Sequence, residues 1–298
     1  MSAGSNRGWT APGGGDGSTE FGSGSPGDSL GGAGCSLKSA GGDVRAGVPG
    51  RGIGALPISD RMKMNAGLVP RCKTLADVGC DHAYTAIYLT ACGRAGRCIA
   101  MDVAAGPLAR AEENIRRYGL EERIETRRSD GLAGLRPGEA DVIMIGGMGG
   151  PLMLDILRRG LACVRAARAL VLQPQSELEE FRRGLRQLSL AVLAEDMCCE
   201  GGKYYTAIYA ENAERSMPGD CKQEETAERG LSAWLLERYG PCLIAGRHPV
   251  LREFLQRELQ KKEKLAARLA GQATEKSRER QKVLAEELQE ISRLLELF

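Results

Sequence analysis

Short apolar runs alternate with amphipathic stretches between residues 56 and 210, and this alternation constrains the fold more than any other feature of the chain. The runs long enough for a buried strand are 74–79, 97–102, 123–127, 141–145 and 169–173. Helices are expected over 56–68, 83–91, 106–118, 151–161 and 177–188. In the stretch 106–118, for example, Leu108, Ala111 and Ile115 share one helical face. A strand–helix alternation of this kind predicts a doubly wound parallel sheet.

Two further strands are expected at the end of this region, over 191–199 and 204–210. Residues 200–203 between them read Glu-Gly-Gly-Lys, a turn sequence that predicts an antiparallel hairpin. A hairpin that closes a parallel sheet is the usual ending of a class I, Rossmann-like methyltransferase domain. The expected fold class is therefore an α/β sheet of that kind.

The chain divides by composition into four segments. Eighteen of its 40 glycines precede residue 55, so residues 1–55 are expected to be a disordered Gly/Ser-rich tail, or the product of an upstream start codon. Residues 56–210 form the α/β domain, 211–223 a polar linker, and 224–298 a C-terminal helical arm. Gly271 separates two heptad-like seams of the arm, which predicts an antiparallel, coiled-coil-like hairpin. The seams are Leu255, Leu259, Lys262, Ala266 and Leu269, then Leu284, Leu288, Ile291, Leu295 and Phe298. The sequence leaves open whether this arm only packs or also clamps RNA.

Charge and cysteine content exclude several classes of protein. Lys and Arg number 41 against 39 Asp and Glu, which excludes a globally basic protein that coats nucleic acid by charge alone. We find no apolar run long enough to span a membrane and no signal peptide, so we expect a cytoplasmic protein without a membrane partner. The ten cysteines include no C-x-x-C pair, and with only two histidines no metal site is expected. Reduced, buried thiols are predicted at Cys72, Cys80, Cys92, Cys98, Cys163 and Cys242.

The first strand ends in a turn that indicates the cofactor. Asp77 and Gly79 lie at its end, and Cys80 follows. A dinucleotide-binding turn would carry glycines where Asp81 and Tyr84 stand, and a carboxylate there would repel a pyrophosphate. A cationic cofactor without phosphate fits better, and S-adenosylmethionine meets both conditions.

Acidic residues follow the next two strands. Asp102 ends the second strand, with Val103 beside it, and is expected to accept the ribose hydroxyls of the cofactor. The alternative for Asp102 is a helix N-cap. Asp130 and Gly131 follow the third strand, where Asp130 either accepts the adenine amine of the cofactor or forms an ordinary Asp-Gly turn.

The fourth strand ends in Gly-Gly-Met-Gly-Gly, residues 146–150. Ligands of open α/β sheets bind beyond the carboxyl ends of strands, so Gly146, Gly147 and Met148 are expected at the cofactor and Gly149 at the substrate. Gln173 after the fifth strand is expected to line the same opening, its alternative being a plain turn. The chain lacks an Asn/Asp-Pro-Pro-aromatic run here, which argues against an exocyclic amine as the methyl acceptor.

Asp81, His82 and Tyr84 form a polar cluster at the start of the following helix. The conservative interpretation is an Asp N-cap with two surface residues. Acid and base groups beside a methyl donor instead suggest that the cluster positions a nucleobase. His248, at a helix entrance, is expected to be structural.

Several motifs together resemble the bacterial tRNA (adenine(22)-N1)-methyltransferase family, TrmK. The resemblance runs from about residue 56 to the end and includes Ala76-Asp-Val-Gly-Cys-Asp-His-Ala-Tyr84, Gly106-Pro-Leu-Ala-Arg-Ala-Glu-Glu-Asn114, Gly146-Gly-Met-Gly-Gly150, Leu172-Gln-Pro174, Glu200-Gly-Gly-Lys-Tyr-Tyr205, Tyr239-Gly-Pro241 and Arg247-His-Pro249. Cys80 stands where the family is expected to have a serine. The resemblance implies S-adenosylmethionine as cofactor and N1 of an adenine in the D-arm region of tRNA as methyl acceptor.

Carried over by residue, the resemblance makes Asp81 the catalytic group, with His82 and Tyr84 beside it. Asp77, Gly79, Asp102 and Asp130 would hold the cofactor, and the glycine-rich strand end would border both cofactor and base. Met148, Tyr84 or Tyr205 is expected to support the exposed ring. We expect a monomer or a weak dimer. The alternatives are a methyltransferase for another RNA base or a small molecule, and a non-catalytic RNA-binding protein on the same fold.

Overall fold

The computed structural model describes residues 56–215, 231–270 and 274–298. The predicted tail, most of the predicted linker and Gly271 lie outside these residues. The described strands are β1 (Cys72–Val78), β2 (Ala95–Asp102), β3 (Ile124–Arg128), β4 (Val142–Met148), β5 (Ala169–Pro174), β6 (Leu190–Glu200) and β7 (Lys203–Asn212). The helices of the sheet region are α1 (Asp60–Leu68), α2 (Tyr84–Ala91), α3 (Ala105–Arg117), α4 (Gly150–Arg159), α5 (Leu161–Ala166) and α6 (Leu178–Gln187).

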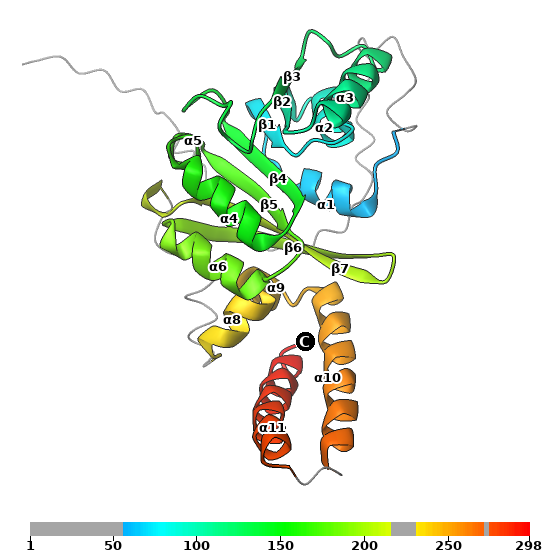
Figure 1. Cartoon of the computed structure of the whole chain (residues 1–298), viewed down its shortest axis with the longest axis vertical. Helices are drawn as coiled ribbons and strands as arrows, with labels where there is room; N and C mark the ends of the chain where they lie inside the picture. Colours follow the sequence, from blue (N-terminus) through cyan, green and yellow to red (C-terminus); the bar gives the residue numbers. More distant parts are fainter. Residues whose placement is uncertain (1–55, 216–230, 271–273) are drawn as a thin grey trace, which may run out of the picture. The chain divides into compact units, whose positions relative to one another are not determined.

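The strands form one seven-stranded sheet in the order β3-β2-β1-β4-β5-β7-β6 (Figure 1). The first five strands are parallel, and β7 runs antiparallel to both β5 and β6. This is the doubly wound sheet with a closing hairpin that the sequence predicted. The order reverses between β1 and β4, so a ligand crevice is expected at their carboxyl ends.

Successive side chains of each strand point to opposite faces of the sheet and pack into two cores, one on each face. On β2, Ile99 and Met101 pack with α4, α5 and α6, whereas Cys98 and Ala100 pack with α2 and α3. Figure 1 shows these helices on opposite faces. The predicted burial of cysteines is confirmed for Cys80, Cys98 and Cys163, but it is wrong for Cys92, which follows α2 and is exposed.

Helix α5 was not predicted. The expected helix 151–161 is instead interrupted at Gly160, where a Cβ would lie 2.5 Å from Cδ1 of Leu132. Helix α4 therefore ends at Arg159 and α5 starts at Leu161, because close packing against Leu132 requires a glycine between them.

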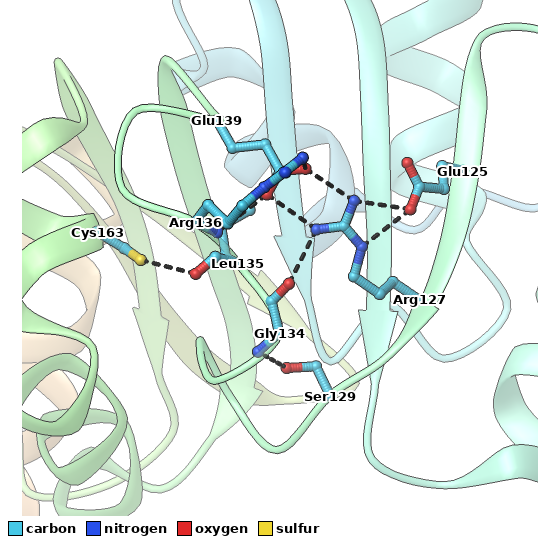
Figure 2. A network of polar contacts seen from close by, with 8 residues as sticks. All are labelled: Glu125, Arg127, Ser129, Gly134, Leu135, Arg136, Glu139 and Cys163. Atoms are coloured by element: carbon cyan, nitrogen blue, oxygen red, sulfur yellow. Dashed lines mark hydrogen bonds and ion pairs between the residues drawn. The ribbon is translucent and has the colours of Figure 1, made fainter.

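The β3–β4 connection contains no α-helix and is held by Arg127 (Figure 2). The Arg127 guanidinium donates to the carbonyl of Gly134 at 2.9 Å and to both carboxylate oxygens of Glu139 at 2.8 and 3.0 Å. This pairing lowers the pKa of Glu139 to about 2. Ser129 Oγ accepts from the Gly134 amide at 2.8 Å. These bonds fix the loop that leads from β3 back to β4.

The described part of the arm contains α8 (Ala233–Tyr239), α9 (Pro241–Ala245), α10 (Pro249–Ala270) and α11 (Glu275–Leu295). Helices α10 and α11 pair as the predicted hairpin, with an ion pair between Lys262 and Glu287. Leu294 is fully buried in this pairing, whereas the predicted seam residue Leu295 is only half-buried. The arm packs on the β6–β7 hairpin through a cluster that includes Met197, Leu243 and Leu251.

A buried ion pair joins the sheet to the arm. Arg182 of α6 donates to Glu195 of β6 at 2.7 Å and to the carbonyls of Glu237 and Arg238 of α8 at 2.6 and 3.0 Å. At the other end of the sheet, β7 extends to Asn212, two residues into the predicted linker. The buried Asn212 amide donates to the carbonyl of Arg165 at 3.1 Å, which ties this end of the strand to α5.

Candidate active site

The turn between β1 and α2 has an unusual backbone conformation. Gly79, Asp81 and Ala83 have φ values of 75°, 47° and 57°. The amides of Gly79 and Cys80 donate to the Met101 carbonyl of β2 at 2.8 and 3.0 Å. Non-glycine residues in the left-handed region are strained, and such strain concentrates at functional sites. The turn is therefore a candidate ligand site on geometric grounds alone.

Asp81 presents its carboxylate to solvent at the opening of this turn. Its Oδ1 lies 3.7 Å from Nε2 of His82 and 3.9 Å from Nη2 of Arg110. The rings of His82 and Tyr84 stack with centroids 5.7 Å apart. The N-cap of α2 is Ala83, with no side-chain hydrogen bond, so the interpretation of Asp81 as a helix cap is wrong. The three predicted residues form one polar cluster, in which Asp81 is exposed and His82 and Tyr84 are half-buried.

Two carboxyl groups face the turn from the strand ends. Asp102 Oδ1 accepts from the amide of Ala104 at 2.9 Å, and Oδ2 accepts from the amide of Asp81 at 3.4 Å. The N-cap of α3 is Ala104, so Asp102 does not cap that helix. Asp77 is only 5% exposed; burial and the negative charge of Asp102 raise its pKa from 3.8 to about 7. A nearby cation would stabilise the ionised form of this carboxyl.

The chemistry of these groups fits S-adenosylmethionine. Each Asp102 oxygen accepts one backbone amide and keeps a lone pair for a ribose hydroxyl. Val103 next to it is 60% exposed, which leaves an apolar surface for a purine ring. The Cys80 thiol is buried, and burial together with the Asp77 charge raises the thiol pKa. A pyrophosphate would be repelled by the carboxylates of Asp81 and Asp102 at this strand end.

The end of β4 bulges at Gly147. The β4–β5 register shifts between Gly146 and Met148, and Gly147 has a φ of 79°. Its amide donates to Oε1 of Gln173 at 3.2 Å, while Nε2 of Gln173 donates to the Pro174 carbonyl at 3.2 Å. Gln173 is 1% exposed. Its amide thus shapes the bulge and is not presented to a substrate, contrary to the expectation that it lines the opening.

Met148 joins the glycine-rich end to the cofactor turn. A Cβ on Gly79 would lie 2.4 Å from Cε of Met148, so the tip of this methionine crosses the turn, while the φ of 75° at Gly79 favours glycine there. On the other side, a Cβ on Gly150 would lie 2.5 Å from the Ser176 carbonyl oxygen, and one on Gly149 would lie 3.3 Å from Ser176 Oγ. Two motifs about 70 residues apart in sequence therefore lie against each other at the strand ends, where the sheet topology predicts a ligand site.

Three predicted site residues have other partners. Asp130 pairs with Nη1 of Arg159 at 2.8 Å, which lowers its pKa, although its side chain is 64% exposed. Gly131 packs on α4, because a Cβ there would lie 2.9 Å from Cγ2 of Ile156. The ring of Tyr205 on β7 lies under the Arg61 guanidinium of α1 at 5.0 Å.

Two asparagines near these strand ends were missed by the sequence analysis. Asn114 of α3 donates to the His82 carbonyl at 3.0 Å and so supports the strained turn. Asn65 of α1 is 8% exposed, and its Oδ1 has no hydrogen-bond partner within the described ranges. Its Nδ2 would lie 3.2 Å from a Cβ on Gly146. Asn114 ends one of the motifs on which the family resemblance rests, and the signal for Asn65 was a polar residue at a buried helical position.

The described residues contain no group of three or more His, Cys, Asp or Glu side chains placed to hold a metal ion. Within the same ranges, none of the helices combines the length and apolar character needed to cross a bilayer.

Comparisons with known proteins agree on one family. The family model TrmK, described as tRNA (adenine(22)-N(1))-methyltransferase, matches residues 75–293. The curated tRNA (adenine(22)-N(1))-methyltransferase of Bacillus subtilis (strain 168) is 30% identical over 242 residues, which cover 81% of this chain and 98% of that protein.

Solved structures give the same result. The crystal structure of the B. subtilis m1A22 tRNA methyltransferase TrmK is 30% identical, with a TM-score of 0.67 over 80% of this chain and 99% of that one. Streptococcus pneumoniae Sp1610, a candidate tRNA (m1A22) methyltransferase in complex with S-adenosyl-L-methionine, is 31% identical, with a TM-score of 0.66 over the same shares of the two chains. The chain therefore belongs to the tRNA (adenine(22)-N(1))-methyltransferase family.

Proposed function

We propose that this protein transfers the methyl group of S-adenosylmethionine to N1 of adenine 22 in the D-arm region of tRNA. The observation that carries the proposal is the contact between the acidic β1–α2 turn and the glycine-rich end of β4. It gives a chain of this family a cation-binding half and an adjoining half with almost no side chains. The first suits the cofactor and the second suits a planar base.

Asp102 and Asp77 are the proposed cofactor residues, with the backbone of Gly79 and Cys80 and the side chain of Val103. Bound S-adenosylmethionine supplies an electrophilic methyl group on a sulfonium. Asp102 would accept the ribose hydroxyls, and the carboxyl of Asp77 would balance the positive charge of the cofactor. Asp130, Gly131, Gly146 and Met148 stay predicted cofactor neighbours. The Asp130 carboxylate is paired with Arg159, so a contact with the cofactor adenine would have to share this carboxylate with the arginine.

Asp81 is the proposed catalytic residue. Adenine N1 has an in-plane lone pair, and its attack on the methyl group leaves positive charge on the base. The exposed Asp81 carboxylate would stabilise that charge or accept a hydrogen bond from the acidified N6 amine. His82 and Tyr84, stacked beside it, would orient the ring. Because N1 is a Watson–Crick position, the base must be unpaired or flipped to reach this cluster.

The glycine-rich end would receive the target base. Gly147 and Gly149 carry no side chain that would block a ring from the strand end. We propose that Gln173 acts here by holding the bulge, since both ends of its amide are bonded to backbone. We propose that Tyr205 anchors α1 through Arg61, whose amide also donates to Glu200 at 3.0 Å.

We propose that residues 56–210 are the methyltransferase domain and that the arm, residues 224–298, contacts the tRNA backbone. Arg257, Lys261, Lys264 and Arg268 step by four, three and four residues along α10, and all are exposed. They therefore share one helical face, which we call the basic stripe. Lys261, Lys264 and Arg268 have no ion-pair partner within the described ranges. A row of unpaired cations suits phosphates.

Charge reversal tests the basic stripe. Lys261→Glu with Lys264→Glu is expected to weaken tRNA binding and to reduce the slope of log affinity against log salt by about two, roughly one per lost phosphate contact. Lys276→Glu with Lys282→Glu on α11 makes the same change in net charge and serves as the control. Equal losses in the two double variants would count against a specific role for α10.

The proposed function is tested by methylating an unmodified bacterial tRNA pool with the purified protein and S-adenosylmethionine. Mass spectrometry of the digested product is expected to reveal 1-methyladenosine, and reverse-transcription stops to map it to position 22. Cofactor binding without any methylated nucleoside in tRNA would reject the proposal in favour of another acceptor. As part of the proposal we place the activity in the cytoplasm, where tRNA is found, and assign it to a monomer or a weak dimer, which light scattering checks.

A further inference from the structure

A cavity of about 340 Å³ lies where α6, the β6–β7 hairpin and the arm meet. Met197, Tyr204 and Thr206 of the hairpin line one side, and Tyr239, Leu251 and Phe254 of the arm line the other. The volume falls within the range of small-molecule sites. None of the residues assigned to the cofactor or the target adenine lines it.

The wall of this cavity is aromatic. Tyr204 and Phe254 meet edge to face with centroids 5.1 Å apart, and Tyr239 lies 6.3 Å from Phe254. The Tyr204 hydroxyl donates to Glu253 at 2.7 Å and accepts from Arg257 at 2.9 Å, while Tyr239 donates to Glu258 at 2.8 Å. These bonds fix the rings. Fixed aromatic side chains are the usual platforms for unstacked nucleobases.

The lining also supplies hydrogen-bond acceptors, and the Arg238 guanidinium in it is paired with Glu258 at 2.8 Å. Glu177, Glu179 and Glu180 at the start of α6 border the opening. Glu180 is exposed and has no ion-pair partner among the residues that the structure describes. Inside, Thr206 contributes a hydroxyl, and the residue is only 3% exposed. Carboxylates repel a phosphate but accept from the amino and imino groups of a base.

The cavity lies between two surfaces already assigned to tRNA. Helix α6 follows directly after Ser176, whose Oγ accepts from the Gly150 amide of the glycine-rich end at 3.3 Å. On the opposite side, the Tyr204 hydroxyl is bonded to Arg257, the first residue of the basic stripe. The cavity is thus connected through its lining residues to both surfaces that the proposed function assigns to tRNA.

We propose that this cavity binds an unpaired nucleobase of the tRNA substrate, distinct from the adenine that is methylated. The inference rests on the proposed function and adds a second base-recognition point to it. It assigns the phosphates to α10 and one extruded base to the aromatic wall. Substrate choice among tRNAs would then depend on an unpaired nucleotide as well as on the target adenine.

The test combines abasic tRNA substitutions with variants of the wall. Each unpaired nucleotide of the D-arm region is replaced in turn by an abasic residue, and tRNA affinity is measured by fluorescence anisotropy. At one position the abasic change is expected to weaken binding to the wild-type protein about tenfold, as for the loss of one stacked base. With Phe254→Leu that same change is expected to have almost no further effect, because the platform is already lost.

Trp234→Leu is the matched control. Trp234 contacts Tyr239 edge to face at 6.1 Å in the same aromatic cluster but does not line the cavity. It is expected to leave the abasic effect intact. If Phe254→Leu fails to fold, Glu180→Gln and Thr206→Val take its place, since both keep the size of the side chain. The proposal is overturned if no abasic position loses its effect in any wall variant.

The binding readout keeps this result separate from the proposed function. Absence of 1-methyladenosine with intact wild-type tRNA would reject the methylation activity whatever the anisotropy shows. Normal methylation at position 22 with an abasic effect that is equal in wild type and all wall variants would reject only the base-binding cavity.

Discussion

The two halves of the sheet's carboxyl edge differ in what they present to a ligand. At the β1–β2 half, side chains carry the chemistry: Asp77, Asp81 and Asp102 bring three carboxyl groups to a strained turn. At the β4 half, the Gly146–Gly150 segment presents mainly backbone, and the nearby Gln173 amide is bonded internally. Met148 is the one large side chain of that segment, and it crosses onto Gly79.

This difference explains how two ligands of different chemistry can bind side by side at one edge of the sheet. A sulfonium cofactor with ribose hydroxyls is recognised by charge and by acceptors, which need side chains held in place. A flat base that must come within reach of the methyl group needs space and a fixed backbone. Substitutions in the acidic half should therefore alter chemistry and cofactor affinity, and those in the glycine half should alter substrate fit.

The largest expected effect is that of Asp81→Ala. Removal of a positioned carboxylate that stabilises the developing charge is expected to lower single-turnover methylation about 100-fold or more. Calorimetric affinity for S-adenosylmethionine should change little, because Asp81 contacts the cofactor half only through its backbone amide. Asp155→Ala, another exposed carboxylate, is the control. Near wild-type turnover in Asp81→Ala would remove the catalytic assignment.

Asp102→Ala is expected to lower the affinity for S-adenosylmethionine more than the rate of methyl transfer. Loss of a charge-assisted, bidentate acceptor costs about 1.5–3 kcal/mol, so affinity for S-adenosylmethionine should fall about 10- to 100-fold. The rate at saturating cofactor should be much less affected than in Asp81→Ala. Isothermal titration calorimetry and single-turnover kinetics separate the two. If Asp102→Ala binds the cofactor as well as wild type does, the acidic half is not the cofactor half.

The acidic half was more predictable from sequence than the glycine half, and the reason is physical. Asp77 and Asp102 lie at the ends of their strands and Asp81 follows one, and strand ends are set by local apolar spacing. The partners of other residues depend on distant packing. Arg159 pairs with Asp130 across 29 positions, and Ile156 occupies the space beside Gly131. Likewise, nothing local indicates that Gln173 is closed off or that Asn65 lacks a partner.

Gly147→Ala tests whether the glycine half has a role in substrate binding. Gly147 and Gly138 both have a φ of 79°, and neither has an atom closer than 3.8 Å to an added Cβ. Each alanine substitution should therefore cost about 1–2 kcal/mol of stability through backbone strain. Only Gly147→Ala is expected to reduce kcat/KM for tRNA, by about tenfold. Equal kinetics in both variants, at equal loss of melting temperature, would deny the glycine half a substrate role.

The smallest expected effect is a pH dependence confined to the acidic half. Below about pH 4 Asp77 is protonated in both folded and unfolded chains. Between its ordinary pKa of 3.8 and its folded value of about 7, the unfolded chain loses this proton while the folded chain retains it. The folded state then binds more protons, so the free energy of unfolding falls as pH rises through this window.

Asp77→Asn cannot ionise and should lack this contribution. Its melting temperature relative to wild type is expected to rise by a few degrees between pH 5 and pH 8, as scanning calorimetry can measure. Saturating S-adenosylmethionine should narrow the difference, because a bound cation favours the ionised carboxyl of the wild type. The offset of Gly147→Ala from wild type should be constant over the same pH range, since that half buries no carboxyl at the strand ends. A pH-independent offset for Asp77→Asn as well would mean that the buried carboxyl does not distinguish the two halves.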